Sequence, residues 1–286
     1  MNLIEIFKKF PNQEACIKHL ELKRWKGEKA ICTYCGSSKT SKHLKRHQCQ
    51  SCYKSFSVLV GTIFEDTNLP LQKWFLAIAL FSNAKKGISA LQLSRDIDTT
   101  YKTAWSISRK IRLAMKEENA DLLCGLTQID DTYIKTKKDD DDKRDGGSKK
   151  KLNNTPVFAM SNNGKINAFK VNDLKASTIL EIVMGKVKLG STIHSDSAFN
   201  YDGLKLGYNH KKVKHAVEFV SKNKVHTNGV ETFWSLLKRG IRGNFHHISK
   251  KYLQDYINEF QFRFNRRAFK SEVIFDEILN NMLGVK

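Results

Sequence analysis

The sequence has no long hydrophobic run and few acidic residues for its size. No stretch of its 286 residues approaches the roughly 18 uncharged apolar residues that a membrane helix needs, which excludes a membrane-spanning protein. The segment Met1–Phe10 lacks the apolar core and cleavage site of a signal peptide, so we expect a soluble, cytoplasmic protein. Only 29 acidic residues oppose 50 lysines and arginines, which leaves a formal net charge of +21. This deficit of negative charge favours a polyanionic partner, and we expect nucleic acid.

The absence of a secretory signal also bears on the cysteines, because it indicates metal binding rather than disulfides. Four of the six cysteines form two Cys-x-x-Cys pairs with 13 residues between them: Cys32, Cys35, Cys49 and Cys52. Each pair can form a tight turn whose backbone amides point at the thiolates, and Gly36 tolerates the positive φ that such a turn often needs. The spacing predicts a zinc ribbon over residues 29–57. The zinc would be structural, since four thiolates leave no position open for water.

Two histidines between the pairs, His43 and His47, are rival ligands for this metal. Because four thiolates already stand at suitable spacing, we expect both histidines to be solvated or to face DNA. Cys16 and Cys124 are left over, and core or neutral surface positions suffice for them.

Helical patterns flank the cysteine-rich segment, as a short lead-in over residues 1–28 and a longer region over residues 62–118. The longer region begins with Pro70 at the start of an apolar helix, which is a favoured place for proline. Two shorter helices are then predicted, Ile88–Arg95 and Thr99–Arg112.

The two shorter helices suit a helix-turn-helix, since the second is rich in lysine, arginine and threonine. Its first turn, with Tyr101 and Lys102, would face the major groove of DNA. The alternative is an ordinary three-helix bundle in which Trp105 and Ile107 are core residues.

Strand patterns dominate residues 122–270, and residues 271–286 are expected to form a C-terminal tail. The Asn163-Gly164 pair predicts a hairpin turn, because both residues accept positive φ. The order of predicted elements is β-β-β-α-β-α-β-α-α, which is typical of a ribonuclease-H-like mixed sheet with helices. The chain is therefore predicted to be a multidomain α+β protein: a zinc ribbon, a helix-turn-helix segment and a mixed-sheet domain.

Three acidic residues stand where that fold would bring them together. Asp130 lies in the first strand, Asp196 follows the fourth strand, and Glu231 opens a later amphipathic helix. The first strand would be central with the fourth beside it, so three carboxylates could converge and hold two Mg²⁺ or Mn²⁺ ions. The alternative for these acids is a purely structural role. Asp196 could cap a turn, and Asn228 and Glu231 have the spacing of a capping box. Asp131 would point to the opposite face from Asp130, and Asp130 is our choice of ligand.

Basic residues follow the third acid on the same helix. Ser235 and Lys238 lie four and seven positions after Glu231 and hence on one helical face. Lys238 is placed to meet a DNA phosphate, and Arg239 and Arg242 extend the basic edge, whereas Phe233 and Trp234 are expected to face the core. Plain solubility is the alternative for these charges.

The charged run Lys135–Gly147 holds four consecutive aspartates between the first two predicted strands. A run of this kind, ending in glycines, is most simply a mobile loop. Its aspartates have no scaffold to aim them at a metal ion.

The combined motifs resemble bacterial insertion-sequence transposases of the ISXO type, which join a zinc ribbon to a DDE (Asp-Asp-Glu) integrase-like domain. The resemblance extends from Trp25 to Phe269. It depends on the two cysteine pairs and on seven further blocks: Phe56–Phe64, Lys86–Leu93, Tyr101–Trp105, Ile129–Tyr133, His226–Trp234, Leu237–Gly240 and Glu259–Asn265. One departure stands out, since the family usually has Asp-Glu-Thr-Tyr followed by Gly-Gly, whereas this chain has Asp130-Asp131-Thr-Tyr133 followed by Ile-Lys-Thr-Lys.

The resemblance implies that Asp130, Asp196 and Glu231 are the catalytic metal ligands and that Lys238 contacts DNA. It implies a DNA transposase that cleaves the element's ends and joins them to target DNA, as a homodimer or larger assembly associated with the nucleoid. Two rival functions are a non-catalytic zinc-ribbon regulator that binds DNA and a nuclease acting on branched DNA.

Overall fold

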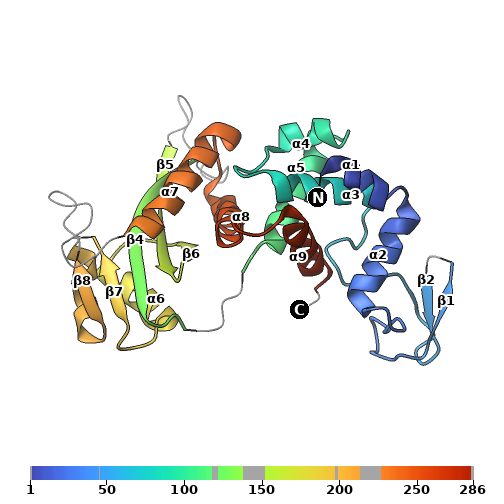
Figure 1. The fold of residues 1–286 in the computed structure, drawn as a ribbon, viewed down its shortest axis with the longest axis horizontal. Coiled ribbons are helices and arrows are strands. Elements are labelled where there is room, and N and C mark those ends of the chain that lie inside the picture. The colour runs from blue at the N-terminus through green and yellow to red at the C-terminus, as the bar shows by residue number, and fades with distance from the viewer. Residues whose placement is uncertain are drawn as a thin grey trace, which may run out of the picture. The chain divides into compact units, whose positions relative to one another are not determined.

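The computed structural model describes residues 2–44, 46–117, 122–137, 152–196, 199–212 and 227–284. The chain divides into two compact units, which Figure 1 shows with their elements labelled. Unit 1 consists of Met1–Met115 and Ala268–Lys286, and unit 2 consists of Lys116–Arg267. No helix within the described ranges is long and apolar enough to cross a membrane.

Unit 1 combines a small sheet with helices. Its elements are α1 (Leu3–Lys9), α2 (Gln13–Trp25), β1 (Thr40–His43), β2 (Arg46–Cys49), β3 (Ser55–Phe56), α3 (Leu71–Asn83), α4 (Ala90–Asp96), α5 (Tyr101–Ala114) and α9 (Ser271–Leu283). The three strands pair antiparallel in the order β1-β2-β3. Local sequence sets the helix starts: Pro70 precedes α3, and the hydroxyls of Ser89 and Thr100 accept the amides of Gln92 and Thr103.

Residues 271–286, which the sequence analysis assigned to a tail, contain helix α9. Its apolar side chains recur every three to four residues and are buried: Ile274, Phe275, Ile278, Leu279 and Met282. Asn281 donates to the carbonyl of Ala114 at 2.8 Å, and Lys23 Nζ lies 2.9 Å from Asp276 Oδ2. The helical period was present in the sequence, but only the contacts show that α9 packs with the N-terminal helices.

Unit 2 is built on a mixed five-stranded sheet. Its elements are β4 (Leu126–Lys137), β5 (Leu152–Asn162), β6 (Lys165–Lys170), α6 (Ala176–Lys186), β7 (Thr192–Ser195), the 3₁₀ segment η2 (Phe199–Leu206), β8 (Asn209–Lys212), α7 (Asn228–Gly240), the π-helical segment η3 (Ile241–Phe245), the 3₁₀ turn η4 (Lys250–Tyr252) and α8 (Leu253–Asn265). The strand order is β6-β5-β4-β7-β8. As expected from the sequence, the first strand of the unit is central and the fourth lies beside it.

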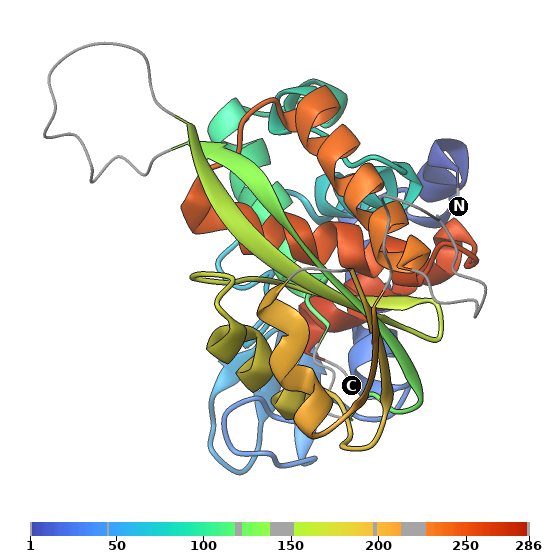
Figure 2. The same cartoon turned by 90° about the vertical axis from the view of Figure 1, so that its left-hand side faces the viewer.

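Strand direction divides the sheet into two halves. β4, β5 and β6 pair antiparallel, whereas β7 and β8 run parallel to β4 and to each other. Figure 2 shows β4 and β5 as a long twisted hairpin. The turn between β5 and β6 has positive φ at Asn163 (49°) and Gly164 (73°), as the Asn-Gly pair predicted. The last described strand, β8, ends at Lys212, and residues 213–226 lie outside the described ranges.

Alternation along β4 separates two hydrophobic cores. Ile134 belongs to the core on the α7 and α8 side, together with Phe233 and Leu237. Ile129 belongs to the core on the other side, with residues of α6 and η2. Even-numbered positions of β4 therefore face α7 and odd-numbered positions face α6 and η2. The first three residues of the charged run predicted as a loop belong to the strand, because β4 continues to Lys137. The rest of that run, including the four aspartates, lies outside the described residues.

Amide side chains of α8 cover the outer edge of β6. Asn265, Gln261 and Gln254 accept the backbone amides of Ile166, Ala168 and Lys170 at 2.7–2.8 Å. The three amides are spaced by four and seven residues and so share one helical face. They occupy hydrogen-bonding groups that an open edge strand would offer to another chain.

Helix α7 approaches the sheet closely at Gly229, whose amide donates to Gln128 Oε1 at 2.9 Å. A Cβ at Gly229 would lie 2.8 Å from Ser161 Oγ and 2.9 Å from Gln128 Oε1, closer than side chains tolerate. A side chain at this position would force Ser161 or Gln128 to move, so glycine is the residue that fits without rearrangement.

Gly229→Ala should lower the free energy of unfolding by about 1–3 kcal/mol, because overpacking a close contact displaces the helix or its neighbours. Urea unfolding followed by circular dichroism measures the change. The control is Gly185→Ala on α6, where a Cβ meets nothing within 4 Å. That change should stabilise the helix by about 0.5–1 kcal/mol. Equal effects from both substitutions would contradict the steric account.

Candidate metal-binding active site

Asp130 lies half-buried in the middle of the central strand β4, on the face covered by α7. Trp234 of α7 donates its indole N–H to Asp130 Oδ2 at 3.0 Å. The sequence analysis placed Trp234 in the core, and it is indeed only 5% exposed. The sequence analysis did not predict its contact with Asp130. Helical periodicity predicts which side of the helix a tryptophan occupies, but not the direction of its indole N–H.

Asp196 follows β7, the strand that runs parallel to β4. Gln128 pairs with His194 in that register, so two further residues along each chain bring Asp196 to the level of Asp130. The two carboxylates are close enough that Asp196 raises the pKa of Asp130. The structure therefore brings together two of the three acids that the sequence singled out.

Glu231 lies in the first turn of α7, one helical turn before Trp234. Its Oε1 accepts a hydrogen bond of 2.6 Å from the hydroxyl of Thr227, the residue that caps the helix. The capping box considered for Asn228 and Glu231 is absent: Asn228 is the first helical residue, and the cap residue Thr227 makes no side-chain bond to a backbone amide. The carboxylate of Glu231 is therefore held by a side chain beside the site.

Burial of Asp130 raises the pKa of its carboxyl group to about 7, and the carboxylates of Asp196 and Asp131 act in the same direction. Hydrogen bonds from the backbone amide of Asp131 and from Trp234 oppose this rise. A carboxyl group in such surroundings is neutral or charged near neutral pH depending on what lies beside it. A divalent cation would favour the charged form.

Asp131 points to the opposite face of β4, as strand alternation predicted. Its Oδ1 accepts a short hydrogen bond from the hydroxyl of Tyr201, which belongs to η2 and is fully buried. Burial and the neighbouring Asp131 carboxylate raise the pKa of Tyr201, so the phenol keeps its proton and acts as the donor. The bond connects β4 to the segment that follows Asp196.

The residues predicted to contact DNA differ in how exposed they are. Lys238 is half-buried and donates to Thr132 Oγ1 at 2.6 Å, so its ammonium group lies along the same face of β4 as Asp130. Arg239 and Arg242 are exposed, the latter within the π-helical segment η3 that extends α7. In unit 1, Tyr101 and Lys102 are exposed at the start of α5.

The four cysteines of the two pairs converge in unit 1. Their sulfurs all lie within 4.8 Å of one another, with Cys32 and Cys52 at 3.7 Å and Cys35 and Cys49 at 3.6 Å. Tetrahedral zinc with Zn–S bonds of about 2.3 Å requires sulfurs about 3.8 Å apart, so the arrangement fits zinc. Backbone amides of Cys52 and Ser51 lower the pKa of Cys49, which favours a thiolate ligand. Gly36 has φ of 74°, as expected for the turn.

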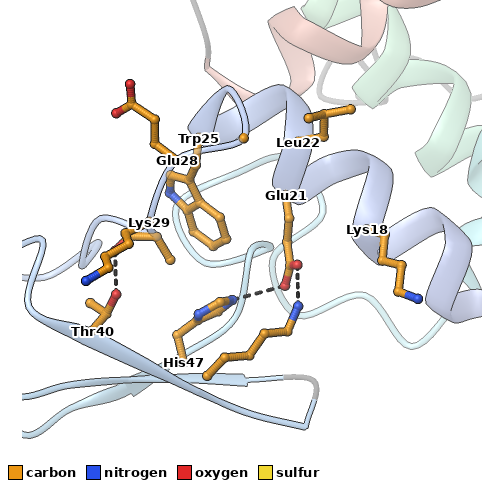
Figure 3. A pocket seen from close by; sticks show the side chains of 11 residues that line it. Lys18, Glu21, Leu22, Trp25, Glu28, Lys29, Thr40 and His47 are labelled. Atoms are coloured by element: carbon orange, nitrogen blue, oxygen red, sulfur yellow. Dashed lines mark hydrogen bonds and ion pairs between the residues drawn. The ribbon is translucent and has the colours of Figure 1, made fainter.

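His47 is not solvated, contrary to the prediction. It is 6% exposed, stacks on Phe56 and meets the edge of Trp25. Its Nε2 lies 3.0 Å from Glu21 Oε1, and Figure 3 shows both side chains pointing toward one another in a pocket of about 380 Å³. Glu21 also accepts a bond from Lys42. His47 is thus a packing residue between α2 and the small sheet, whereas His43 is exposed.

The three acids have the donor chemistry of a Mg²⁺ or Mn²⁺ site, since these ions prefer carboxylate oxygens. Within the described part of the chain, however, only the four cysteines have all their ligand atoms within 4.8 Å of one another. The carboxylates of Asp130, Asp196 and Glu231 are more widely spaced than the sulfurs.

The sequence profile of the ISXO2-like transposase domain matches residues 122–265, just over half of the chain. The chain belongs to the ISXO2-like transposase family. The matched range contains all three candidate acids and the whole five-stranded sheet.

Two proteins with similar sequences are described as transposable-element or transposase-like proteins, in agreement with this family. A protein from the transposable element ISH50 of Halobacterium salinarum is 25% identical over 243 residues, which cover 79% of this chain and 80% of that protein. A transposase-like protein of Haemophilus influenzae is 30% identical over 110 residues, which cover 38% of this chain and 88% of that protein. A chain of a pre-cleavage Mos1 transpososome has 9% identity, covers 76% of this chain and 82% of its own, and has a TM-score of 0.28, which is too low to support an argument.

Cys49→Ser should reduce the zinc content from about one ion per chain to nearly none, because loss of a thiolate removes much of the binding free energy of about 10–16 kcal/mol typical of structural zinc. Mass spectrometry of metals in the gel-filtered protein measures this content. Cys124→Ser is the control, since Cys124 is exposed and lies outside the cluster. A variant at Cys49 that keeps a full complement of zinc would rule the site out.

The contribution of Asp130 to the stability of the magnesium-free protein should fall as the pH rises from about 4 to about 7. The pKa of Asp130 is about 7 in the folded state and about 3.9 when unfolded, so between these values the folded state holds a proton that the unfolded state releases. Asp130→Asn should therefore be more stable than the unmodified protein at pH 8, by up to about 4 kcal/mol, and little different at pH 4. Urea unfolding at both pH values tests this. Glu181→Gln, which removes an exposed carboxylate of α6, is the control for the loss of one negative charge.

Proposed function

We propose that this chain is a DDE-type DNA transposase whose catalytic acids are Asp130, Asp196 and Glu231. The observation that carries the proposal is the placement of these acids. Asp130 lies on β4, Asp196 directly follows β7, which runs parallel to β4, and Glu231 lies in the first turn of the helix that packs along β4. Membership of the ISXO2-like transposase family supports the same assignment.

The sheet supports a ribonuclease-H-like catalytic domain. Its order β6-β5-β4-β7-β8 combines an antiparallel half with two parallel strands, and the acids lie where these halves meet on β4 and β7. Helices cover both faces, α7 and α8 on one and α6 on the other. Such a sheet presents one acid from a rigid central strand and one from the carboxyl end of its parallel neighbour.

Divalent cations, Mg²⁺ or Mn²⁺, would be held by the three carboxylates, and when bound they activate the attacking oxygen and stabilise the leaving oxygen of a phosphodiester. In the first reaction, water attacks phosphorus at the end of the element, the P–O3′ bond breaks and the 3′-hydroxyl is released with a proton. In the second, that 3′-hydroxyl attacks phosphorus in target DNA, gives up its proton and displaces a target 3′-hydroxyl. No redox partner is needed for either step.

Double-stranded DNA as substrate is supported by charge and exposure. The chain carries a net charge of +21. Lys238 lies beside Asp130 on the same face of β4, and Arg239 and Arg242 continue from it as an exposed basic edge. Tyr101 and Lys102, exposed at the start of α5, together with the zinc ribbon, would recognise the terminal repeats. Pairing two ends requires a homodimer or larger assembly associated with the nucleoid.

Asp196→Asn should lower cleavage of end DNA and its joining to a plasmid by at least about 100-fold, since loss of a metal ligand removes several kcal/mol of transition-state stabilisation. Binding of end DNA, followed by electrophoretic mobility shift, should stay within a few fold. Asp202→Asn is the matched control, because Asp202 is an exposed acid six residues later that pairs with Lys212.

The same cleavage and joining assay distinguishes the proposed transposase from the two rival functions. Metal-dependent cutting without joining would indicate a nuclease acting on branched DNA, and binding without either reaction would indicate a regulator. Undiminished cleavage by Asp196→Asn would show that Asp196 is not a catalytic acid.

A further inference from the structure

Helix α7 is aligned along the central strand by three side-chain contacts on one face of β4. Gln128 accepts the amide of Gly229 at 2.9 Å, Asp130 accepts the indole N–H of Trp234 at 3.0 Å, and Thr132 accepts from Lys238 Nζ at 2.6 Å. The strand partners are alternate residues, and the helix partners are five and four residues apart.

The distance between successive contact residues is similar along the strand and along the helix. Two strand residues advance by about 6.7 Å. Five and four helix residues advance by about 7.5 Å and 6 Å. The helix axis and the strand can therefore run side by side, in the same direction, without losing the contacts. A shift of α7 by one residue would move its three contact residues along the strand by about 1.5 Å.

Trp234 is the middle contact and the one that touches a candidate metal ligand. It follows Glu231 by three residues, so it lies one turn from the third acid while it binds the first. Its ring is buried in the core shared by Phe233 and Leu237 and packs beside Phe233 at a centroid distance of 5.2 Å. A buried ring of this kind cannot follow the carboxylate if the carboxylate turns, so the N–H selects one orientation of Asp130.

We propose that Trp234 is a positioning residue for the metal site: its indole N–H holds Asp130 Oδ2 and thereby keeps the strand acid in register with Glu231 on the same helix. The inference rests on the proposed function in one respect, that Asp130 and Glu231 bind divalent cations. A tryptophan present only for packing would be replaceable by phenylalanine without effect on metal affinity. A positioning tryptophan would not be, because second-shell hydrogen bonds orient ligands.

The test is binding of Mn²⁺ alone to the zinc-loaded protein, measured by the loss of the free Mn²⁺ signal in electron paramagnetic resonance. Trp234→Phe should raise the Kd for Mn²⁺ by about 10- to 100-fold, the range found for removal of partners of metal ligands. Cleavage of end DNA should then need correspondingly more metal, and its rate at saturating metal should recover most of the original value. Unchanged Kd and unchanged metal dependence would overturn the proposal.

Trp74→Phe is the matched control, since it removes an indole hydrogen bond of similar length from an equally buried ring. Trp74 donates to Thr67 Oγ1 at 2.9 Å and is 2% exposed, but it lies in unit 1. It should lower thermal stability and leave the Kd for Mn²⁺ unchanged. An equal loss of Mn²⁺ affinity in both variants would overturn the proposal.

A second variant guards against loss of packing at position 234. Benzothienylalanine placed there keeps the bicyclic ring and replaces only the N–H by sulfur, so it should weaken Mn²⁺ binding as Trp234→Phe does. Normal affinity with this analogue would overturn the proposal even if Trp234→Phe failed to fold. The variant Asp130→Asn distinguishes a failure of the proposed function from a failure of the proposed role of Trp234. If it binds Mn²⁺ normally, the proposed function fails, whereas if it loses Mn²⁺ while both changes at position 234 retain it, only the role of Trp234 fails.

Discussion

The half-buried carboxyl group of Asp130, in the middle of the central strand, is the constraint around which unit 2 is arranged. A carboxylate in the middle of a sheet loses hydration, and the neighbouring Asp196 and Asp131 add like charge, which together raise its pKa to about 7. Such a group is tolerated when hydrogen bonds or a cation compensate for the lost water. The Trp234 N–H supplies one such bond, and the proposed divalent cations would supply the remaining compensation.

Side-chain contacts hold β4 on both faces near Asp130. The absence of a side chain at Gly229 lets helix α7 approach without displacing Ser161 or Gln128, and the helix brings Trp234, Glu231 and Lys238 to the strand. On the other face, the bond from Tyr201 to Asp131 connects β4 to the segment after Asp196. Stability and site geometry are therefore supported by the same contacts, so substitutions in them should affect folding and metal binding together.

Much of this arrangement was predictable from local patterns. Cysteine spacing predicted the four-sulfur cluster, the Asn-Gly pair predicted the β5–β6 turn, and the order of strands and helices predicted a mixed sheet with β4 at its centre. Strand alternation predicted that Asp130 and Asp131 point to opposite faces, but only the contacts with Trp234 and Tyr201 show which of them faces α7. His47 was misjudged, because a polar residue between metal ligands gives no sign that Trp25, Phe56 and Glu21 surround it.

Residue type and short-range spacing were enough to predict the two cysteine pairs, the mixed sheet and the three candidate acids, and composition gave the basic charge. Only the tertiary structure decided that the segment after Phe269 is a packed helix, that Trp234 reaches Asp130 and that Tyr201 reaches Asp131. Those contacts join residues 70 or more positions apart. Their formation depends on side-chain direction and on the close approach of whole elements, which no local pattern records.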